Sequence, residues 1–162
     1  MDQRGAHFMS ELIDNGECFF NIAEKSQEDL RKDIFDIERI LFDHVGDGDP
    51  IADFPVKHYR IGNLYAREVF IPAGHMLVGK IHSGVSISVC SMGDISVMTE
   101  LGVHRIKAPF TCVAEAGIKR VGYAHSDTIW ISIHETDCEN IEDLENELTT
   151  LSYSDFKKIG EI

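Results

Sequence analysis

The chain has 162 residues, of which 43% are hydrophobic, so it can form one folded domain with a core and is too apolar to be disordered. Its 28 acidic and 15 basic residues give a net charge of −13, which repels phosphate backbones, so we expect no nucleic-acid partner. The sequence has neither an apolar run long enough to span a membrane nor the charged and apolar blocks of a signal peptide. We therefore expect a soluble, cytoplasmic protein without a membrane partner.

The first predicted element is an amphipathic helix that begins after Ser26, a residue type that commonly caps helices. The stretch 46–50, rich in glycine and aspartate, is predicted to end this helix, and residues 1–50 are assigned to an N-terminal helical segment. Apolar residues follow the cap at helical spacing, with charged residues between them: Leu30, Ile34, Ile37 and Leu41.

From residue 56 to residue 134, short runs rich in β-branched and aromatic residues recur roughly every 8 to 10 positions, separated by Gly, Pro and Asp. Many short, evenly spaced strands are typical of a β-barrel or sandwich and argue against βαβ units. The sequence therefore predicts a barrel over residues 51–135, with about nine strands.

A C-terminal helical segment is predicted over residues 136–162. Thr136-x-x-Glu139 has the form of a capping box, and a further short helix is expected from Ser154 to Ile159. Apolar residues at helical spacing follow the box: Ile141, Leu144 and Leu148. The three segments are expected to form one domain.

The cysteines are widely separated and form no C-x-x-C pair, so neither a zinc knuckle nor a redox motif is present. We expect free thiols, as in a reducing compartment. The four positions are Cys18, Cys90, Cys112 and Cys138.

Within the predicted barrel, residues 74–93 read G-x5-K-x-H-x3-S-x6-G, with Gly74, Lys80, His82, Ser86 and Gly93 at the marked positions. This spacing resembles the first motif of the cupin superfamily, G-x5-H-x-H-x3,4-E-x6-G. Lys80 and Ser86 replace a histidine and the glutamate of that motif, and the second cupin motif is not present. The resemblance implies a mainly β, cupin-like antiparallel barrel (jelly roll), to which the helical spacing described above adds an N-terminal amphipathic helix and short C-terminal helices. It leaves His82 as the one inherited ligand position.

More narrowly, the barrel region resembles uncharacterised cupin-like proteins of tailed bacteriophages and prophages, whereas the first 50 residues lie outside the resemblance. This implies a phage or prophage accessory protein, placed in the host cytoplasm if phage-encoded. The residues that carry the likeness include Tyr65-Ala66-Arg67-Glu68, Ile71-Pro72-Ala73-Gly74, Gly79-Lys80-Ile81-His82, Gly117-Ile118-Lys119-Arg120, Tyr123-Ala124 and Asp127-Thr128-Ile129-Trp130.

Strand alternation indicates which polar side chains share a face, and it places Lys80 and His82 together. A hairpin through residues 72–74 would bring Glu68 beside Lys80. Trp130, Ser132 and His134 share a second face, with Tyr123 expected on the partner strand. The candidate ligand-binding residues are therefore Glu68, Lys80, His82, Tyr123 and His134.

Each candidate also has a structural interpretation. Lys80 and Glu68 could form an exposed cross-strand ion pair, and His82 could be a core histidine that bonds to the backbone. A divalent transition metal could use His82 first, then His134 and Glu68, although the Lys80 cation would weaken it. In a metal-free site, Lys80 could hold a carboxylate or phosphate while His82 acts as acid or base.

The leading functional hypothesis is an accessory protein that binds a small molecule in the barrel, and whether it catalyses a reaction is left open. One alternative is a metal-dependent cupin enzyme such as a dioxygenase, lyase or isomerase. Another is an interaction protein that modulates host machinery or defence through a host protein partner. Several strands are apolar on both faces and need a cover, so we also expect a homodimer.

Overall fold

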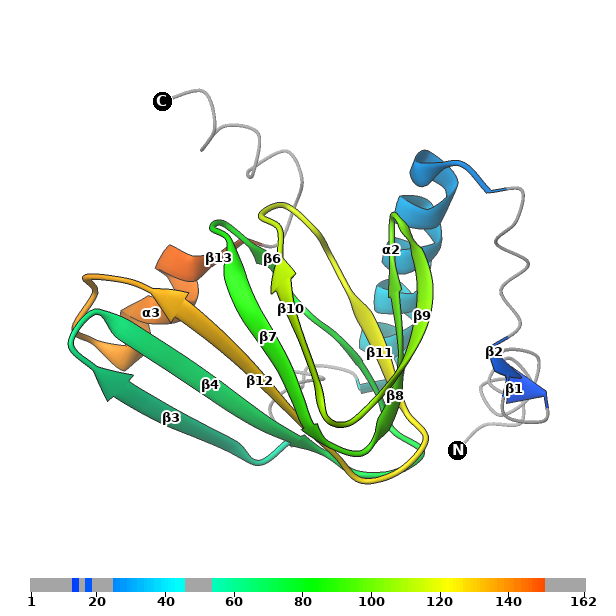
Figure 1. The fold of residues 1–162 in the computed structure, drawn as a ribbon. Helices are drawn as coiled ribbons and strands as arrows, with labels where there is room; N and C mark the ends of the chain where they lie inside the picture. The colour runs from blue at the N-terminus through cyan, green and yellow to red at the C-terminus, as the bar shows by residue number, and fades with distance from the viewer. Residues whose placement is uncertain (1–12, 15–16, 19–24, 46–53, 151–162) are drawn as a thin grey trace.

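The computed structural model describes residues 13–14, 17–18, 25–45 and 54–150 (Figure 1). Two short strands, β1 (Ile13–Asp14) and β2 (Glu17–Cys18), pair with each other before helix α2 (Gln27–Val45). Ser26 caps this helix, because the Asp29 backbone N–H donates to Ser26 Oγ (3.2 Å) and the Ser26 N–H donates to the Asp29 carboxylate (3.2 Å). The predicted N-terminal helix is confirmed, while the expected linker at 46–50 lies outside the described residues.

Two antiparallel sheets form the body of the protein. The five-stranded sheet has the order β10-β7-β12-β4-β3 and the four-stranded sheet the order β5-β11-β8-β9. The strands of the first are β3 (Val56–Ile61), β4 (Leu64–Ile71), β7 (Ser86–Met92), β10 (Phe110–Ala114) and β12 (Thr128–Glu135). Those of the second are β5 (Met76–Val78), β8 (Asp94–Thr99), β9 (Gly102–Lys107) and β11 (Val121–Ala124).

The connections between strands identify the architecture. Only β3–β4 and β8–β9 are hairpins within one of these two sheets. The chain crosses between the sheets after β4, β5 (by way of β6, Ile81–His82), β7, β9, β10 and β11. This alternation is the strand order of a jelly roll, in which two sheets face each other across a shared interior. The predicted antiparallel β-barrel of the jelly-roll type is therefore confirmed (Figure 1).

Apolar side chains fill the interior between the sheets. The interior cluster consists of six buried residues: Val69, Ile71, Cys90, Ile95, Val97 and Ala124. A second cluster lies on the outside of the four-stranded sheet, where α2 packs (Figure 1). This cluster consists of three residues of α2 and three outward-facing residues of the strands: Leu30, Ile34 and Ile37 from the helix, and Val78, Met98 and Val121 from β5, β8 and β11. Strand β8 is thus apolar on both faces because Val97 faces the interior and Met98 faces the helix.

Two ion pairs fasten α2 to the barrel. The Lys119 side chain is fully buried, its Nζ lies 2.6 Å from Glu38 Oε1, and it also lies 5.0 Å from the centre of the Phe35 ring. The Arg31 guanidinium donates two bonds to the Glu100 carboxylate, at 2.9 and 2.7 Å. Both pairs join residues far apart in sequence, so they fix the helix on the sheet.

The two glycines that bracket the sequence motif are required by the backbone. Gly74 and Gly93 have φ angles of +77° and +101°, which L side chains rarely adopt. A Cβ atom on Gly93 would also lie 2.4 Å from Thr128 Oγ1 and 2.5 Å from the Asp127 carbonyl oxygen. Gly93 therefore allows the close approach of two crossing connections.

The C-terminal part contains helix α3 (Ile141–Leu148) and strand β13 (Thr149–Thr150), which pairs with β6 (Ile81–His82). The predicted capping box is wrong. The helix begins one residue after Asn140, whose side chain donates to Asp143 (3.0 Å). The Thr136 hydroxyl instead donates to Glu147 (2.5 Å), so it ties the far end of α3 to the barrel.

Three of the predicted free thiols, Cys90, Cys112 and Cys138, are free in the structure. The side chain of Cys18 and the further helix expected at Ser154–Ile159 lie outside the described residues. No helix within the described ranges is long and apolar enough to cross a membrane.

Candidate functional site

The space between the two sheets contains a cavity of about 470 Å³. The inward positions of β4 and β12 pair across its floor in the order Ile71–Thr128, Val69–Trp130, Arg67–Ser132 and Tyr65–His134. Side chains of β5 and β8, with the Gly122 backbone of β11, form the opposite wall, and α3 with β13 contributes Leu144, Leu148 and Thr149. The register makes the cavity apolar toward Ile71 and polar toward His134, and α3 lies near that polar end (Figure 1).

Two histidines meet at the polar end. The rings of His82 and His134 lie edge to face, with centroids 4.7 Å apart and an interplanar angle of 66°. His82 Nδ1 is 3.5 Å from Ser86 Oγ, so the serine that replaces the motif glutamate still lies beside the motif histidine. Two positions of the sequence motif therefore lie side by side in the structure.

The surroundings keep both imidazoles uncharged near neutral pH. Burial, followed by His134, Arg120 and Arg67, lowers the pKa of His82 to about 3. Burial, followed by Arg120, also lowers the pKa of His134. Each neutral ring presents one donor and one acceptor nitrogen.

Two arginines share the cavity with these histidines. Arg67 and Arg120 both line it, as does Lys80, and no Asp or Glu occurs among the described residues of the lining. Within the described part of the chain, the partly buried Arg67 guanidinium makes no hydrogen bond or ion pair. The charged side chains among the described lining residues are therefore all cationic.

The structure brings some of the predicted site residues together and separates others. Lys80, His82 and His134 line the cavity, and Trp130 and Ser132 share the face of His134 as predicted from alternation. Their binding role stays a prediction.

Glu68 and Tyr123 face away from the cavity. Glu68 accepts from Lys57 Nζ (3.0 Å), and the Tyr59 hydroxyl lies 3.4 Å from its second oxygen. The Tyr123 ring packs edge-on against His125, with centroids 5.0 Å apart. Their predicted placement is wrong because the turns after β4 and after β11 are not hairpins but crossings between sheets.

The sequence-based prediction missed Arg67 and Arg120. A signal was available, because Arg67 has the parity of Val69 and Ile71, whose apolar side chains indicate the inward face of β4. Arg120 lies just before β11, beside Lys119, and only the fold shows that Lys119 faces α2 while Arg120 faces the cavity.

The donor set does not fit the transition metal that the sequence suggested. His82 and His134 supply two imidazoles, but the carboxylate expected third, Glu68, is on the opposite face of its strand. The described residues contain no group of three or more His, Cys, Asp or Glu side chains placed to hold a metal ion. The arginine cations near the histidines also oppose a metal cation.

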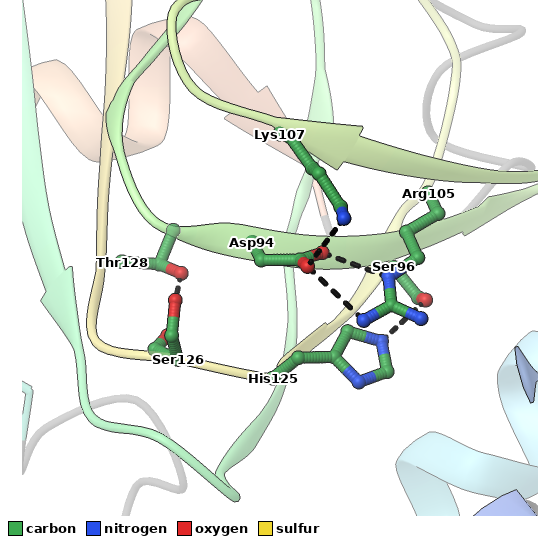
Figure 2. Close-up of polar contacts among 7 residues, drawn as sticks. All are labelled: Asp94, Ser96, Arg105, Lys107, His125, Ser126 and Thr128. Atoms are coloured by element: carbon green, nitrogen blue, oxygen red, sulfur yellow. Dashed lines mark hydrogen bonds and ion pairs between the residues drawn. The ribbon is translucent and has the colours of Figure 1, made fainter. Parts of the chain in front are cut away.

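A second polar cluster lies where β8, β9 and the turn after β11 meet (Figure 2). Arg105 donates two bonds to Asp94, at 2.9 and 3.0 Å, and Lys107 lies 3.7 Å from the same carboxylate. Ser96 Oγ is 2.7 Å from His125 Nε2, but Ser96 is only 4% exposed. Because the serine is buried and the carboxylate is held by Arg105, we assign this cluster a structural role at the barrel corner.

No protein-family model matches the sequence, and no curated protein matches it. Among solved structures, ectoine synthase from P. lautus is 14% identical with a TM-score of 0.49, covering 60% of this chain and 74% of that one. KdgF from Halomonas sp. is 18% identical with a TM-score of 0.47, covering 59% and 91%. A cupin-2 domain protein from Shewanella frigidimarina is 8% identical with a TM-score of 0.43, covering 50% and 79%. The fold assignment rests on the strand order of this chain.

Proposed function

We propose that this protein binds a small organic molecule in the cavity between its two sheets. The observation that carries the proposal is the cavity itself, whose volume of about 470 Å³ is within the range of small-molecule sites, roughly 300–1,000 Å³. Its lining combines an apolar end with convergent polar groups, which is the arrangement that binds and orients a ligand.

The chain contains a reporter for this binding, because its one tryptophan, Trp130, lines the cavity. Small-molecule metabolites can be screened by the change in tryptophan emission. A hit should lose its effect in Ser132→Leu, which adds bulk inside the cavity, and should keep it in Ser91→Leu, an exposed position in β7. Binding that survives the cavity variant, or a screen with no response, would contradict the proposal.

The same screen tests the motif histidine. His82 has one weak polar contact, with Ser86, and an edge-to-face ring contact with His134, so His82→Ala should abolish binding of a hit and change the melting temperature little. A buried structural histidine would give the reverse, a loss of roughly 1–3 kcal/mol of stability with no effect on ligand binding.

A metal-dependent cupin enzyme is the second hypothesis, and the His82–His134 pair is the observation in its favour. Elemental analysis of the purified protein distinguishes the two proposals. One equivalent of a transition metal that is lost in both His82→Ala and His134→Ala would establish the enzyme hypothesis. The donor set leads us to expect no such stoichiometry.

The biological setting is a proposal that the sequence resemblance alone supports. It comprises an accessory role in a phage or prophage, a place in the host cytoplasm and a host protein partner. Affinity capture from host lysate, with a surface-charge variant as control, tests the partner.

A further inference from the structure

We infer that the ligand of the barrel is an organic anion, with its charged group at Arg67 and its apolar body against Trp130. This inference rests on the proposed function and specifies the chemical class of the molecule that the cavity accepts. Its basis is the distribution of charge and apolar surface along the cavity.

The sign of the charge inside the barrel is opposite to that of the whole molecule. The chain carries 28 acidic and 15 basic residues, yet the described lining includes Arg67, Arg120 and Lys80 and no acidic side chain. Glu68, next to Arg67 in the sequence, is turned to the outer face and paired with Lys57. The described lining therefore offers cations, Arg67 foremost, to an anionic ligand although the chain as a whole is acidic.

Arg67 gives the strongest indication of the ligand charge. Its guanidinium faces the cavity, is partly buried, and has no hydrogen-bond or ion-pair partner in the described part of the chain. A partly buried cation is stabilised when its donors are satisfied, and a planar guanidinium matches the two oxygens of a carboxylate or phosphate. A ligand anion would supply the missing acceptors.

The neighbouring histidines fit the same ligand. His82 and His134 are close enough for both rings to face a group bound at Arg67, since Arg67 pairs in register with Ser132, two residues from His134. Neutral imidazoles can each donate one hydrogen bond to an anion without adding a charge. The polar end thus offers donors of two kinds to one head group.

The apolar end of the cavity determines which uncharged part of a ligand can bind there. From Arg67 toward the apolar end, Val69 and Trp130 and then Ile71 form the floor of the cavity. Val97 lines the opposite wall. An aromatic or branched apolar body would bury its surface here while its head stays at Arg67. A small inorganic anion would leave this surface unfilled.

Three probes with one body and different head groups test the inference: 4-phenylbutanoate, 4-phenylbutan-1-ol and 4-phenylbutan-1-amine. Each is titrated into the full-length protein, and binding is followed by Trp130 emission. We expect the carboxylate to bind at least about tenfold tighter than the alcohol, since a hydrogen bond to a charged group contributes about this factor or more. The amine should bind most weakly.

Two matched variants test whether the preference for the carboxylate arises at Arg67. Arg67→Met should remove the preference for the carboxylate and leave the affinity for the alcohol unchanged. Arg39→Met makes the same charge change at an exposed position of α2 and should leave the preference intact. Loss of preference in both variants would assign it to the overall charge and overturn a local site at Arg67.

The outcomes separate this inference from the proposed function. Equal binding of carboxylate and alcohol, or tightest binding of the amine, would overturn the inference and leave the proposed function standing. If none of the three probes changes Trp130 emission at millimolar concentration, the inference fails, and the metabolite screen described above decides the proposed function separately. The ranking in the unmodified protein decides the matter even where a variant does not fold.

Discussion

Single residues set the chemistry of the barrel interior. Lys80 and Ser86 occupy two motif positions that resemble metal-ligand positions, while Arg67 and Arg120 bring cations to the same end of the cavity. His82 keeps its place in the motif, yet its neighbours are those of an anion site. The same backbone position therefore supports a different interaction once the residues around it change.

The depressed pKa of His82 predicts that stability falls in mild acid. The ring takes up a proton near pH 6.5 in the unfolded chain but only near pH 3 in the folded protein. Between these values the unfolded state binds more protons, so this contribution to stability is complete above pH 6.5 and is lost as the pH falls. From pH 7.5 to 5.5, urea denaturation should show a loss of about 1 kcal/mol from His82.

His82→Gln supplies the control for this pH dependence. The glutamine does not titrate, so the difference in unfolding free energy between the two pH values should shrink by about the same 1 kcal/mol. His134 and His125, whose pKa values are also lowered, retain their share in both proteins. An unchanged pH dependence in the variant would contradict the assignment to His82.

At the scale of the elements, the site depends on connections that cross between sheets. Alternation within one strand was enough to predict that Trp130, Ser132 and His134 share a face, and that Lys80 lies with His82. Pairing between strands could not be predicted in the same way, because a short turn can be either a hairpin or a crossing. Glu68 and Tyr123 were misplaced for this reason.

Helix α2 shows the same limit of sequence-based prediction, because the element could be predicted and its distant charged partner could not. The period of Leu30, Ile34 and Ile37 predicted α2 and its buried face, and the structure places that face on the four-stranded sheet. The sequence contained no local signal for its partner, since Lys119 and Glu38 are 81 residues apart. Long-range charge pairs of this kind become visible only when the fold is known.

The ion pair between the buried Lys119 and Glu38 predicts a large loss of stability when the lysine is removed. Lys119→Ala should lower the free energy of unfolding by about 3 kcal/mol, because it leaves Glu38 without its partner under the helix. Lys107→Ala is the matched control, since this lysine is 72% exposed and should change stability by less than about 1 kcal/mol.

Chemical denaturation measures both variants. Adding Glu38→Ala to Lys119→Ala should recover part of the loss, because no unpaired charge then remains. Equal effects of the two lysine substitutions would contradict the role given to the buried pair.

At the scale of the whole molecule, the outer face of the five-stranded sheet is the surface through which we expect the homodimer to form. One cross-strand row is apolar over all five strands: Val113, Ile87, Ile133, Ala66 and Tyr59. Val113, Ile87 and Tyr59 are 64%, 45% and 49% exposed. Helix α2 covers the other sheet, so a second copy of the chain is the cover that we expect for this one.

Light scattering should therefore give twice the chain mass of 18.2 kDa at micromolar concentration. Ile87→Lys combined with Val113→Lys should shift the mass toward the monomer, since two charges would be buried in the contact. Leu101→Lys, at an exposed position of the other sheet's β8–β9 turn, should not. A monomer mass for the unmodified protein at every concentration would refute the dimer.

The position of α3 and β13 has a consequence for the rate of ligand exchange. Leu144, Leu148 and Thr149 form part of the cavity wall, and β13 completes a ladder with β6, the strand that carries His82. The Ser83 N–H donates to the Leu148 carbonyl at 2.8 Å, so this wall is joined to the barrel by backbone bonds. Where a ligand passes this wall to leave the cavity, these bonds must open first. Residence time would then be set by the C-terminal backbone, and amide hydrogen exchange in residues 144–150 would slow when the cavity is filled.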